Sequence, residues 1–232
     1  MDRAWVDAFV GPPVFAGRVL ALAETTFGAA ATIASSFGPE DVVLLHLARE
    51  HAPSLEVFTI DTGRLPPETY EVMDALQRAL GFSLRTLAPE RAAVEALVAE
   101  HGFFSFRESI DARKTCCGVR KVEPLRRALA GKRAWITGLR REQNVTRAEL
   151  RAIEWDDGNG LVKFNPLASW SRADVWEHIR EYGLPYNRLH DVGYASIGCA
   201  PCSRAIRPYE DERAGRWWWE SPEHRECGLH RK

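Results

Sequence analysis

Five cysteines are the residues of this chain whose type and spacing point most directly to chemistry. Cys116 and Cys117 are adjacent, and Cys199 and Cys202 are separated by two residues in the order Cys-Ala-Pro-Cys. Four gathered thiolates are soft ligands that bind zinc or an iron–sulfur cluster. The count therefore divides into four candidate ligands and one remaining cysteine, Cys227.

The adjacent pair helps to choose between these two metal groups. A zinc knuckle normally uses two cysteines with two residues between them at both ends of the site, so that both sulfurs face one ion. The side chains of Cys116 and Cys117 point in diverging directions, which suits the wider spacing of a cubane better. The pattern favours a [4Fe–4S] cluster. A zinc site, or a buried apolar pair beside an unrelated redox CxxC, is the alternative.

Cys227 has a different sequence environment, close to the C-terminus. Arg225 and Arg231 flank it, Gly228 follows it, and His230 lies three residues further on. Positive neighbours lower the pKa of a thiol and raise its thiolate fraction, and terminal segments are often exposed. Cys227 is therefore a candidate nucleophile, with an incidental surface cysteine as the alternative.

Cations gather near the cysteines along the chain. Arg120 and Lys121 come within one helical turn after the first pair, and Arg213 and Arg216 would point the same way on a helix. Paired guanidinium groups match the oxygens of phosphate or sulfate. A charge run is usually a solvated face, but three consecutive tryptophans follow this one, and large aromatic side chains seldom adjoin an idle surface.

Two loops are further candidates for anion binding. The segment Ser35-Ser36-Phe37-Gly38 precedes a predicted helix, whose first N–H groups could cradle an oxyanion. It lacks the lysine of a Walker loop, and an ordinary turn between a strand and a helix is the alternative. The segment from Gly138 to Gln143, with Arg147 beyond it, places more cations at the end of a predicted strand.

Strand-like and helix-like segments must position these residues. Strands are predicted over 55–60, 82–87 and 133–137, after a short apolar run at 30–36, and helices from about 40, then over 66–80, 89–100, 117–130 and 171–182. This order favours an α/β fold with a parallel sheet and helices on both faces. Ligands of such sheets bind at loops after the carboxyl ends of strands, here after Ser36, Ile60 and Thr137.

Composition and charge exclude several classes of protein. The chain has 232 residues, 31 Lys and Arg against 32 Asp and Glu, and 45% hydrophobic residues, as in an ordinary globular protein. The near-zero net charge argues against a nucleic-acid partner, and no apolar run reaches the ~20 residues of a membrane span. Without a signal-peptide pattern, a cytoplasmic location is expected. We predict a single domain over 1–232, with a mobile, irregular C-terminal segment at 203–232.

With these residues assembled, the sequence resembles the phosphoadenylyl-sulfate/adenylyl-sulfate reductase family of assimilatory sulfate reduction. The matching motifs extend over nearly the whole chain: 35–41, 61–64, Cys116-Cys117 with 120–125, 138–143, 199–202 and 226–230. The resemblance implies an adenine-nucleotide hydrolase-like fold, with a modified PP-loop at 35–41.

The cysteines separate two branches of that family. The branch that acts on adenylyl sulfate (APS) carries the CC and CxxC pairs and a [4Fe–4S] cluster, whereas the branch strict for phosphoadenylyl sulfate (PAPS) generally lacks them. This chain has all four cysteines, so it resembles the APS branch. One departure is His224, where the family usually has lysine. No thioredoxin-like domain is expected after residue 232, which implies an external thiol donor such as thioredoxin. Whether the protein forms a homo-oligomer is left open.

The resemblance implies a covalent mechanism. The Cys227 thiolate would attack the sulfur of APS, with AMP as the leaving group, and thioredoxin would then release sulfite from the S-sulfocysteine. Lys121, Arg213 and Arg216 would neutralise the phosphate, with His230 assisting, and the cluster would position Lys121. The expected nucleotide contacts are Ser35, Ser36, Gly38, Thr62, Arg64 and Arg147.

Three other functions stay open. The first is PAPS reduction, or dual specificity for both nucleotides. A structural iron–sulfur or zinc module could bind a partner through the tryptophan-rich segment. A PP-loop enzyme that thiolates tRNA would want an SGGxDS loop, whereas this loop reads Ser-Phe-Gly-Pro-Glu-Asp, and the near-neutral charge also disfavours tRNA.

Overall fold

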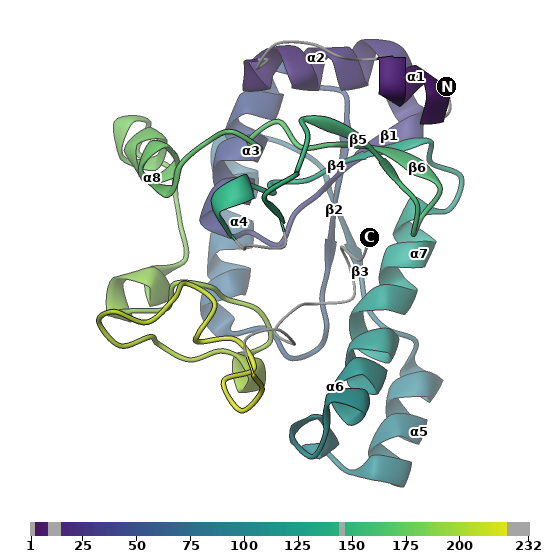
Figure 1. Ribbon diagram of the computed structural model, residues 1–232, viewed down its shortest axis with the longest axis vertical. Coiled ribbons are helices and arrows are strands. Elements are labelled where there is room, and N and C mark those ends of the chain that lie inside the picture. Colours follow the sequence, from purple (N-terminus) through teal and green to yellow (C-terminus); the bar gives the residue numbers. More distant parts are fainter. Residues whose placement is uncertain (1–2, 9–14, 144–146, 222–232) are drawn as a thin grey trace. The chain divides into compact units, whose positions relative to one another are not determined.

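The chain folds into two compact units, each built from three separate stretches of sequence. The computed structural model describes residues 3–8, 15–143 and 147–221. The sheet unit comprises Met1–Thr59, Pro67–Arg85 and Gly131–Arg188, and the cysteine unit comprises Ile60–Pro66, Thr86–Ala130 and Leu189–Lys232. Figure 1 labels the elements. The predicted single domain over 1–232 stays a prediction.

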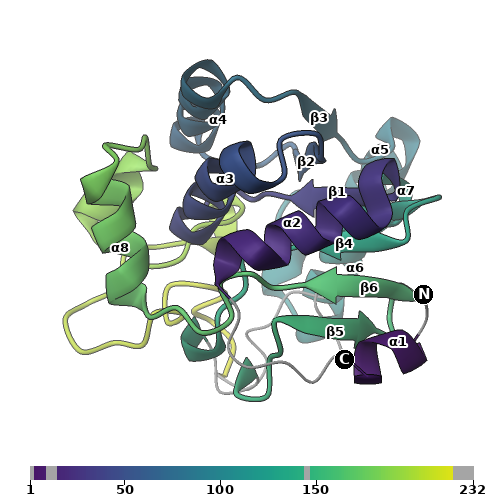
Figure 2. The same cartoon turned by 90° about the horizontal axis from the view of Figure 1, so that it is seen from above.

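A six-stranded, mostly parallel sheet is the framework of the fold, in the order β3-β2-β1-β4-β6-β5 (Figure 2). The strands are β1 (Ala31–Ala34), β2 (Glu56–Ile60), β3 (Leu84–Leu87), β4 (Ala134–Ile136), β5 (Ile153–Asp156) and β6 (Leu161–Phe164). β1 pairs in parallel with β2 and β4, and β4 pairs in parallel with β6. The predicted α/β fold is confirmed.

The last two strands were not predicted. β5 runs antiparallel to β6 and closes that side of the sheet. Neither strand has a clear hydrophobic pattern in the sequence, because β6 carries Lys163 in its middle and β5 carries Glu154. The side chain of Lys163 is 8% exposed, pairs with Glu154 at 3.3 Å and lies 5.4 Å from the Trp135 ring centroid. The buried cation thus replaces the expected apolar residue.

Helices of the sheet unit surround a well-packed core. They are α1 (Arg3–Ala8), α2 (Ala16–Phe27), α3 (Pro39–His51), α4 (Pro67–Leu80) and α8 (Arg172–Glu181), with 3-10 turns at Gly28–Ala30 and Arg141–Gln143. Core side chains with no exposed area include Leu20, Ile33, Leu44 and Phe164. No helix in the described part of the chain is long and apolar enough to cross a membrane.

Helix starts follow local capping chemistry. Pro39 begins α3, and two acidic residues in its first turn suit the positive end of the helix dipole. Ser171 caps α8 as predicted: its hydroxyl accepts the Asp174 N–H at 3.1 Å, and its own N–H donates to the Asp174 carboxylate at 2.7 Å. This capping box satisfies two N–H groups that the helix itself leaves unpaired.

The helices of the cysteine unit are α5 (Arg91–His101), α6 (Ile110–Cys117) and α7 (Glu123–Leu129), with 3-10 turns at Ser105–Arg107 (η2), Arg188–Val192 (η6, which starts in the sheet unit) and Ala200–Cys202 (η7). The segment predicted to be helical over 117–130 is helical through Leu129, but the helix begins earlier than predicted. It starts at Ile110, where the Ser109 hydroxyl accepts the Ala112 N–H at 3.0 Å. A π-helical turn, Gly118–Val122 (η3), then separates α6 from α7. The adjacent cysteines therefore end a helix.

Candidate functional site

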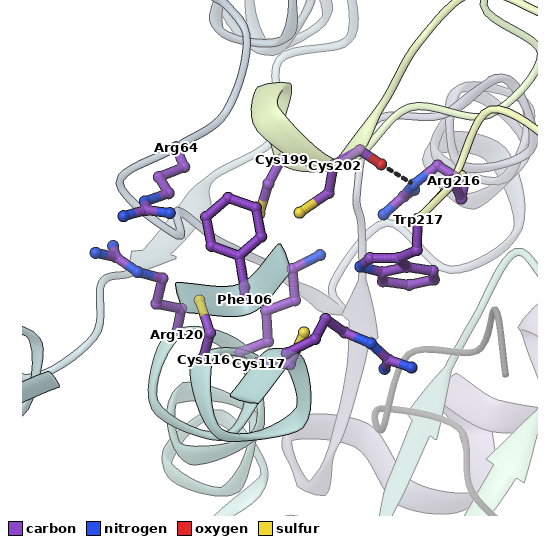
Figure 3. A pocket seen from close by; sticks show the side chains of 11 residues that line it. Arg64, Phe106, Cys116, Cys117, Arg120, Cys199, Cys202, Arg216 and Trp217 are labelled. Atoms are coloured by element: carbon purple, nitrogen blue, oxygen red, sulfur yellow. Dashed lines mark hydrogen bonds between the residues drawn. The ribbon is translucent and has the colours of Figure 1, made fainter. Parts of the chain in front are cut away.

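One cavity of the cysteine unit gathers all four paired cysteines. Cys116 and Cys117 come from the last turn of α6, whereas Cys199 and Cys202 come from the segment of η7. Figure 3 shows the two pairs of sulfurs facing each other across the cavity. The structure thus brings together the four predicted ligands from segments that lie far apart in sequence.

The CxxC segment owes its shape to a tight turn. The Cys202 N–H donates to the Cys199 carbonyl at 2.9 Å, and Pro201 removes one backbone donor inside the turn. The Ala200 N–H donates to the Arg64 carbonyl at 2.8 Å, which ties this turn to the loop after β2. Both sulfurs are consequently held on one side of a short 3-10 helix.

Polar groups on the loop after β2 surround Cys199. The Thr62 hydroxyl lies 3.2 Å from the Cys199 sulfur, and the Arg120 guanidinium donates to the Thr62 carbonyl at 2.8 Å. Arg64 lies 5.1 Å from the Phe106 ring centroid and donates to a backbone carbonyl in the same unit. The predicted residues Thr62 and Arg64 therefore lie at the cysteine cavity.

Four further cavity side chains carry positive charge. Arg113, Arg120, Lys121 and Arg216 line the cavity together with Arg64. The Arg216 Nε donates to the Cys202 carbonyl at 3.3 Å. Five cations around one group of sulfurs favour a net negative occupant, because opposite charges attract strongly in a poorly hydrated site.

The cavity fits a group rich in hydrogen-bond acceptors. The buried Arg64 Nη1 and Trp217 Nε1 atoms have no hydrogen-bond partner among the residues that the structure describes. A buried donor without an acceptor is unfavourable, and sulfide or thiolate sulfur would satisfy it. The cysteines, cations and donors together suit an iron–sulfur cluster. Over the described residues, no three His, Cys, Asp or Glu side chains are grouped to hold one metal ion.

Burial raises the pKa of two cavity thiols, Cys116 and Cys202. It raises the pKa of Cys116, although the Arg64 and Arg120 charges oppose the effect. Burial and the neighbouring Cys199 raise the pKa of Cys202 to about 11 against the Arg216 and Lys121 charges. Because a metal binds thiolates, loading such a site releases protons.

The Ser35–Gly38 loop of the sheet unit lies between β1 and α3, as predicted. The Ser36 N–H and hydroxyl donate to the Asp41 carboxylate at 2.5 and 2.8 Å, and the Phe37 N–H donates to the Ser35 hydroxyl at 3.2 Å. Two of the loop's N–H groups, which were expected to face an oxyanion, are therefore occupied by side chains. Phe37 has φ +60 and is buried, which fixes the turn.

Asp41 is a further functional candidate. In the sequence it was expected only to interact with the helix dipole. Burial raises its pKa to about 6, although hydrogen bonds from Ser36 and Gly138 oppose the shift. A Cβ atom at Gly138 would overlap the Asp41 carboxylate, so the glycine permits this close approach. The loop after β4 thus reaches the loop after β1 through Asp41.

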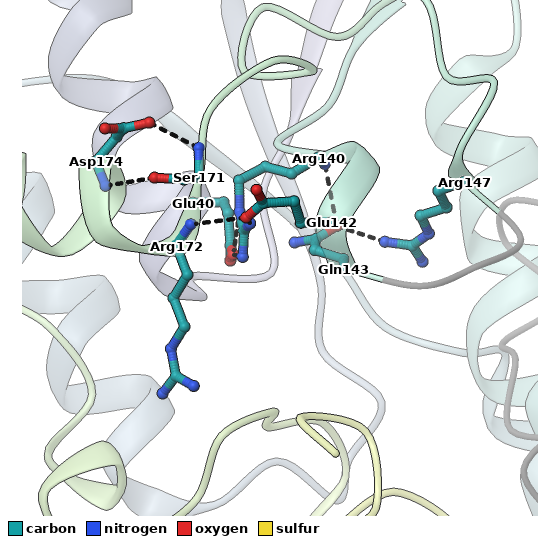
Figure 4. A network of polar contacts seen from close by, with 8 residues as sticks. All are labelled: Glu40, Arg140, Glu142, Gln143, Arg147, Ser171, Arg172 and Asp174. Atoms are coloured by element: carbon teal, nitrogen blue, oxygen red, sulfur yellow. Dashed lines mark hydrogen bonds and ion pairs between the residues drawn. The ribbon is translucent and has the colours of Figure 1, made fainter.

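A polar network organises the loop after β4 (Figure 4). Arg140 is 1% exposed and forms two hydrogen bonds to Glu40, at 2.8 and 2.9 Å. The backbone N–H of Arg140 donates to the side-chain oxygen of Gln143 at 3.2 Å, and the Arg147 guanidinium donates to the same oxygen at 2.5 Å. The predicted Arg147 is therefore anchored to this loop. The buried Arg140–Glu40 pair was missed, because the two residues are 100 positions apart.

The predicted helix under Arg213 and Arg216 does not exist. Residues 213–215 form a turn, and Arg216 pairs with Ser203 in an isolated β-bridge. Both guanidinium groups nevertheless surround one ring, because they lie 5.9 and 4.7 Å from the Trp217 centroid. Trp217 itself is 1% exposed. Residues 203–221 contain no helix or strand, and their predicted mobility stays a prediction.

The predicted site residues divide between the two units. Ser35, Ser36, Gly38 and Arg147 belong to the sheet unit, whereas Thr62, Arg64, Lys121, Arg213, Arg216 and the four paired cysteines belong to the cysteine unit. Cys227 and His230 lie outside the described residues, and their roles stay predictions.

Solved structures with a similar fold define the class of protein. A phosphoadenylyl-sulfate (PAPS) reductase from Candida auris, in its phosphate complex, has a TM-score of 0.74 and 28% identity over 89% of this chain and 98% of that chain. A yeast FAD synthetase in complex with FAD has a TM-score of 0.56 and 17% identity over 82% of this chain and 66% of that chain. The chain therefore has a PP-loop nucleotide-binding fold.

Sequence relatives then identify the family. The model of the phosphoadenosine phosphosulfate reductase domain matches residues 30–205. An adenosine 5'-phosphosulfate reductase of Allochromatium vinosum is 55% identical over 86% of this chain and 78% of its own length. One from Burkholderia cepacia is 51% identical over 85% of this chain and 79% of its own length. The chain belongs to the phosphoadenosine phosphosulfate reductase family and is an oxidoreductase, which confirms the predicted resemblance.

Proposed function

We propose that this chain reduces adenylyl sulfate to sulfite, with AMP as the second product, in cytoplasmic sulfate assimilation. The observation that carries the proposal is the cavity in which Cys116, Cys117, Cys199 and Cys202 gather among cations. Relatives named adenosine 5'-phosphosulfate reductase, at 55% and 51% identity, support the choice of substrate.

The four cysteines are the proposed ligands of a [4Fe–4S] cluster. Their soft sulfurs, the surrounding cations and the unpartnered donors of the cavity support this choice. Cys116, Cys117, Cys199 and Cys202 would hold the cluster, which would supply a compact charge and link two chain segments, while electrons for the reduction come from thiols. Lys121, which lines the same cavity, is the cation that the cluster would position.

The first proposed step is attack by the Cys227 thiolate on the sulfur of APS. A sulfur–sulfur bond forms, the bond between sulfur and the phosphate oxygen breaks, and AMP leaves with the electron pair. Lys121, Arg213 and Arg216 neutralise the charge that develops on the phosphate, and His230 assists at the leaving group. The proposed nucleotide contacts are Ser35, Ser36, Gly38, Thr62, Arg64 and Arg147.

The second proposed step releases sulfite. A thiolate of thioredoxin, or of a similar dithiol donor, attacks the Cys227 sulfur, and sulfite leaves with the electron pair. The donor's second thiol then resolves the mixed disulfide, which returns the Cys227 thiolate. The dithiol is thereby oxidised to a disulfide and supplies both electrons.

A comparison of two substrates tests the proposal. Sulfite release is measured with APS and with PAPS, each in the presence of reduced thioredoxin. We expect release with APS. Equal rates would show dual specificity, and release with PAPS alone would favour PAPS reduction, the activity named for the Candida auris neighbour. Release with neither would leave a structural iron–sulfur or zinc module.

The nucleophile has its own test. Cys227→Ser should abolish transfer of radiolabelled sulfur from APS to the protein, because the hydroxyl is a far weaker nucleophile than a thiolate. Its iron content and visible absorbance should match those of the wild type. A labelled protein adduct in this variant would overturn the assignment of Cys227.

A further inference from the structure

A buried ion pair joins two segments of the cysteine unit. The Arg113 Nε donates to the Glu220 Oε1 at 2.9 Å, and its Nη2 donates to the Glu220 Oε2 at 2.7 Å. The two side chains are only 2% and 3% exposed. Two parallel hydrogen bonds between planar groups fix both the distance and the relative orientation of the side chains.

Arg113 belongs to the helix that presents the adjacent cysteines. It lies on α6, three and four residues before Cys116 and Cys117. Residues at this spacing share a helix face, and Arg113 accordingly lines the same cavity as the two cysteines. One end of the ion pair is therefore rigidly connected to the cysteine cavity.

Glu220 lies near the end of the described part of the chain, one residue before Ser221. Its N–H donates to the Trp217 carbonyl at 2.8 Å, which closes a turn, and Trp217 packs against Cys199 and Cys202. Cys227 follows Glu220 by seven residues. Covalent geometry limits that stretch to about 24 Å, so the position of Glu220 bounds the region that the Cys227 thiol can reach.

Burial of the pair needs a reason beyond stability. An apolar pair of similar volume often stabilises a fold as well as a buried ion pair does, so the charges alone explain little. Three guanidinium groups, those of Arg113, Arg213 and Arg216, lie 4.9, 5.9 and 4.7 Å from the Trp217 ring centroid. The Glu220 carboxylate offsets this charge and adds a directional contact that apolar side chains lack.

We propose that Arg113 and Glu220 are a positioning pair, which fixes the backbone seven residues before Cys227 relative to the cysteine cavity. The inference rests on the proposed function, in which Cys227 must meet a substrate whose phosphate is neutralised by Lys121, Arg213 and Arg216. Neither member of the pair touches the substrate. Its effect is on the rate at which the Cys227 thiolate reaches the sulfur of APS.

A single-turnover experiment separates positioning from stability. Transfer of radiolabelled sulfur from APS to Cys227 is timed in the wild type, in Glu220→Gln and in the double variant Arg113→Met/Glu220→Leu. We expect Glu220→Gln to lower the melting temperature and to slow transfer at least about tenfold, as small misplacements of reacting groups do. The apolar double variant should have the melting temperature and the iron content of the wild type. Transfer of sulfur to Cys227 should nevertheless stay slow.

An exposed ion pair of the same unit supplies the control. Arg91 and Glu95 pair at 2.6 Å on α5 with 90% and 61% of their side chains exposed, so Glu95→Gln should match the wild type in every measurement. If the double variant regains the transfer rate together with its melting temperature, the pair is structural only and the proposal is overturned. Loss of iron from the double variant would also overturn it.

A second variant keeps the proposal testable if the double variant does not fold. Arg113→Lys keeps the positive charge but cannot form the two parallel bonds, so transfer should again be slow at wild-type iron content. Transfer at the wild-type rate would overturn the proposal. A wild-type protein that forms no labelled adduct with APS would instead overturn the proposed function, on which the inference rests.

Discussion

At the scale of single residues, Asp41 shows how burial and hydrogen bonding compete. Two hydrogen bonds from Ser36 favour its charged form, yet burial dominates and raises its pKa to about 6 from 3.8. Between these two pH values the folded chain holds a proton on Asp41 that the unfolded chain has released. The contribution of Asp41 to stability therefore falls as the pH rises from about 4 through 6.

The variant Asp41→Asn tests this pH dependence, because its side chain does not ionise. We expect the difference in the free energy of unfolding, variant minus wild type, to increase by about 3 kcal/mol from pH 4 to pH 7.5. This change corresponds to a shift of roughly two pKa units. Urea unfolding at several pH values measures the difference. Asp174→Asn is a control in which the pH dependence should have the opposite sign, because the hydrogen bonds to Ser171 lower the pKa of Asp174. Parallel curves for Asp41→Asn and wild type would contradict the account.

Residue types predicted the cysteine cavity well but the buried ion pairs poorly. The spacing of the cysteines identified which four sulfurs would gather, because soft ligands in close pairs have few other uses. Arg140 and Arg113 look like surface cations in the sequence, and both are buried against carboxylates far away in the chain. Such pairs depend on tertiary contacts, so no local sequence pattern predicts them.

At the scale of elements, α3 and α8 meet through two histidines. The His46 Nδ1 and the His178 Nε2 are 3.0 Å apart, and the Tyr182 ring centroid lies 4.6 and 4.5 Å from theirs. One proton can be shared across this distance, but a second would place two cations in contact. Burial lowers the pKa of both histidines. The nearby charges are mixed, with Glu50 and Arg49 near His46 and Glu181 near His178.

Acidification should loosen this contact between α3 and α8. A histidine whose pKa is lowered in the folded state stabilises the fold at high pH, and that stability is lost as the pH falls through the unfolded value of 6.5. His178→Gln should therefore lose less stability than the wild type between pH 7.5 and 5.5 in thermal unfolding. His101→Gln, on the exposed end of α5, should follow the wild type. A wild-type pH dependence in His178→Gln would contradict the prediction.

Element boundaries were predictable where local chemistry decides them. Ser171 with Asp174 marked the start of α8 correctly, because a capping box acts within four residues. Ser109 as an N-cap, with Asp111 in the first helical turn, would have marked the start of α6 in a similar way. The π-helical turn after Cys117 had no such signal. A π-turn is rarely formed on its own and often occurs at functional sites, and this one lies directly beside the cysteine cavity.

At the scale of the whole molecule, the two units differ in what holds them together. In the sheet unit, β1, β4 and β6 contribute buried apolar side chains that include Ile33, Trp135 and Phe164. The cysteine unit encloses a smaller cluster of Phe106, Cys199, Cys202 and Trp217, together with the buried Arg113–Glu220 pair. Small cores need additional links, and a bound metal group is one of them. The cysteine unit should therefore depend on the proposed iron–sulfur cluster far more than the sheet unit does.

Cys199→Ser tests this difference between the units. Serine is a poor ligand for iron, so the variant should lose iron and visible absorbance, and the link between segments that lie 82 residues apart, Cys117 and Cys199, should be lost with it. Hydrogen exchange of backbone amides should then accelerate in residues 199–220, because their opening no longer requires release of a metal group. Amides of β4 and β6 should exchange at their wild-type rates. Cys199→Ala serves as the matched variant, since it removes the same sulfur without adding a hydroxyl, and it should show the same regional pattern. Equal acceleration in both units would show that the chain unfolds as one cooperative body and that the cluster stabilises all of it.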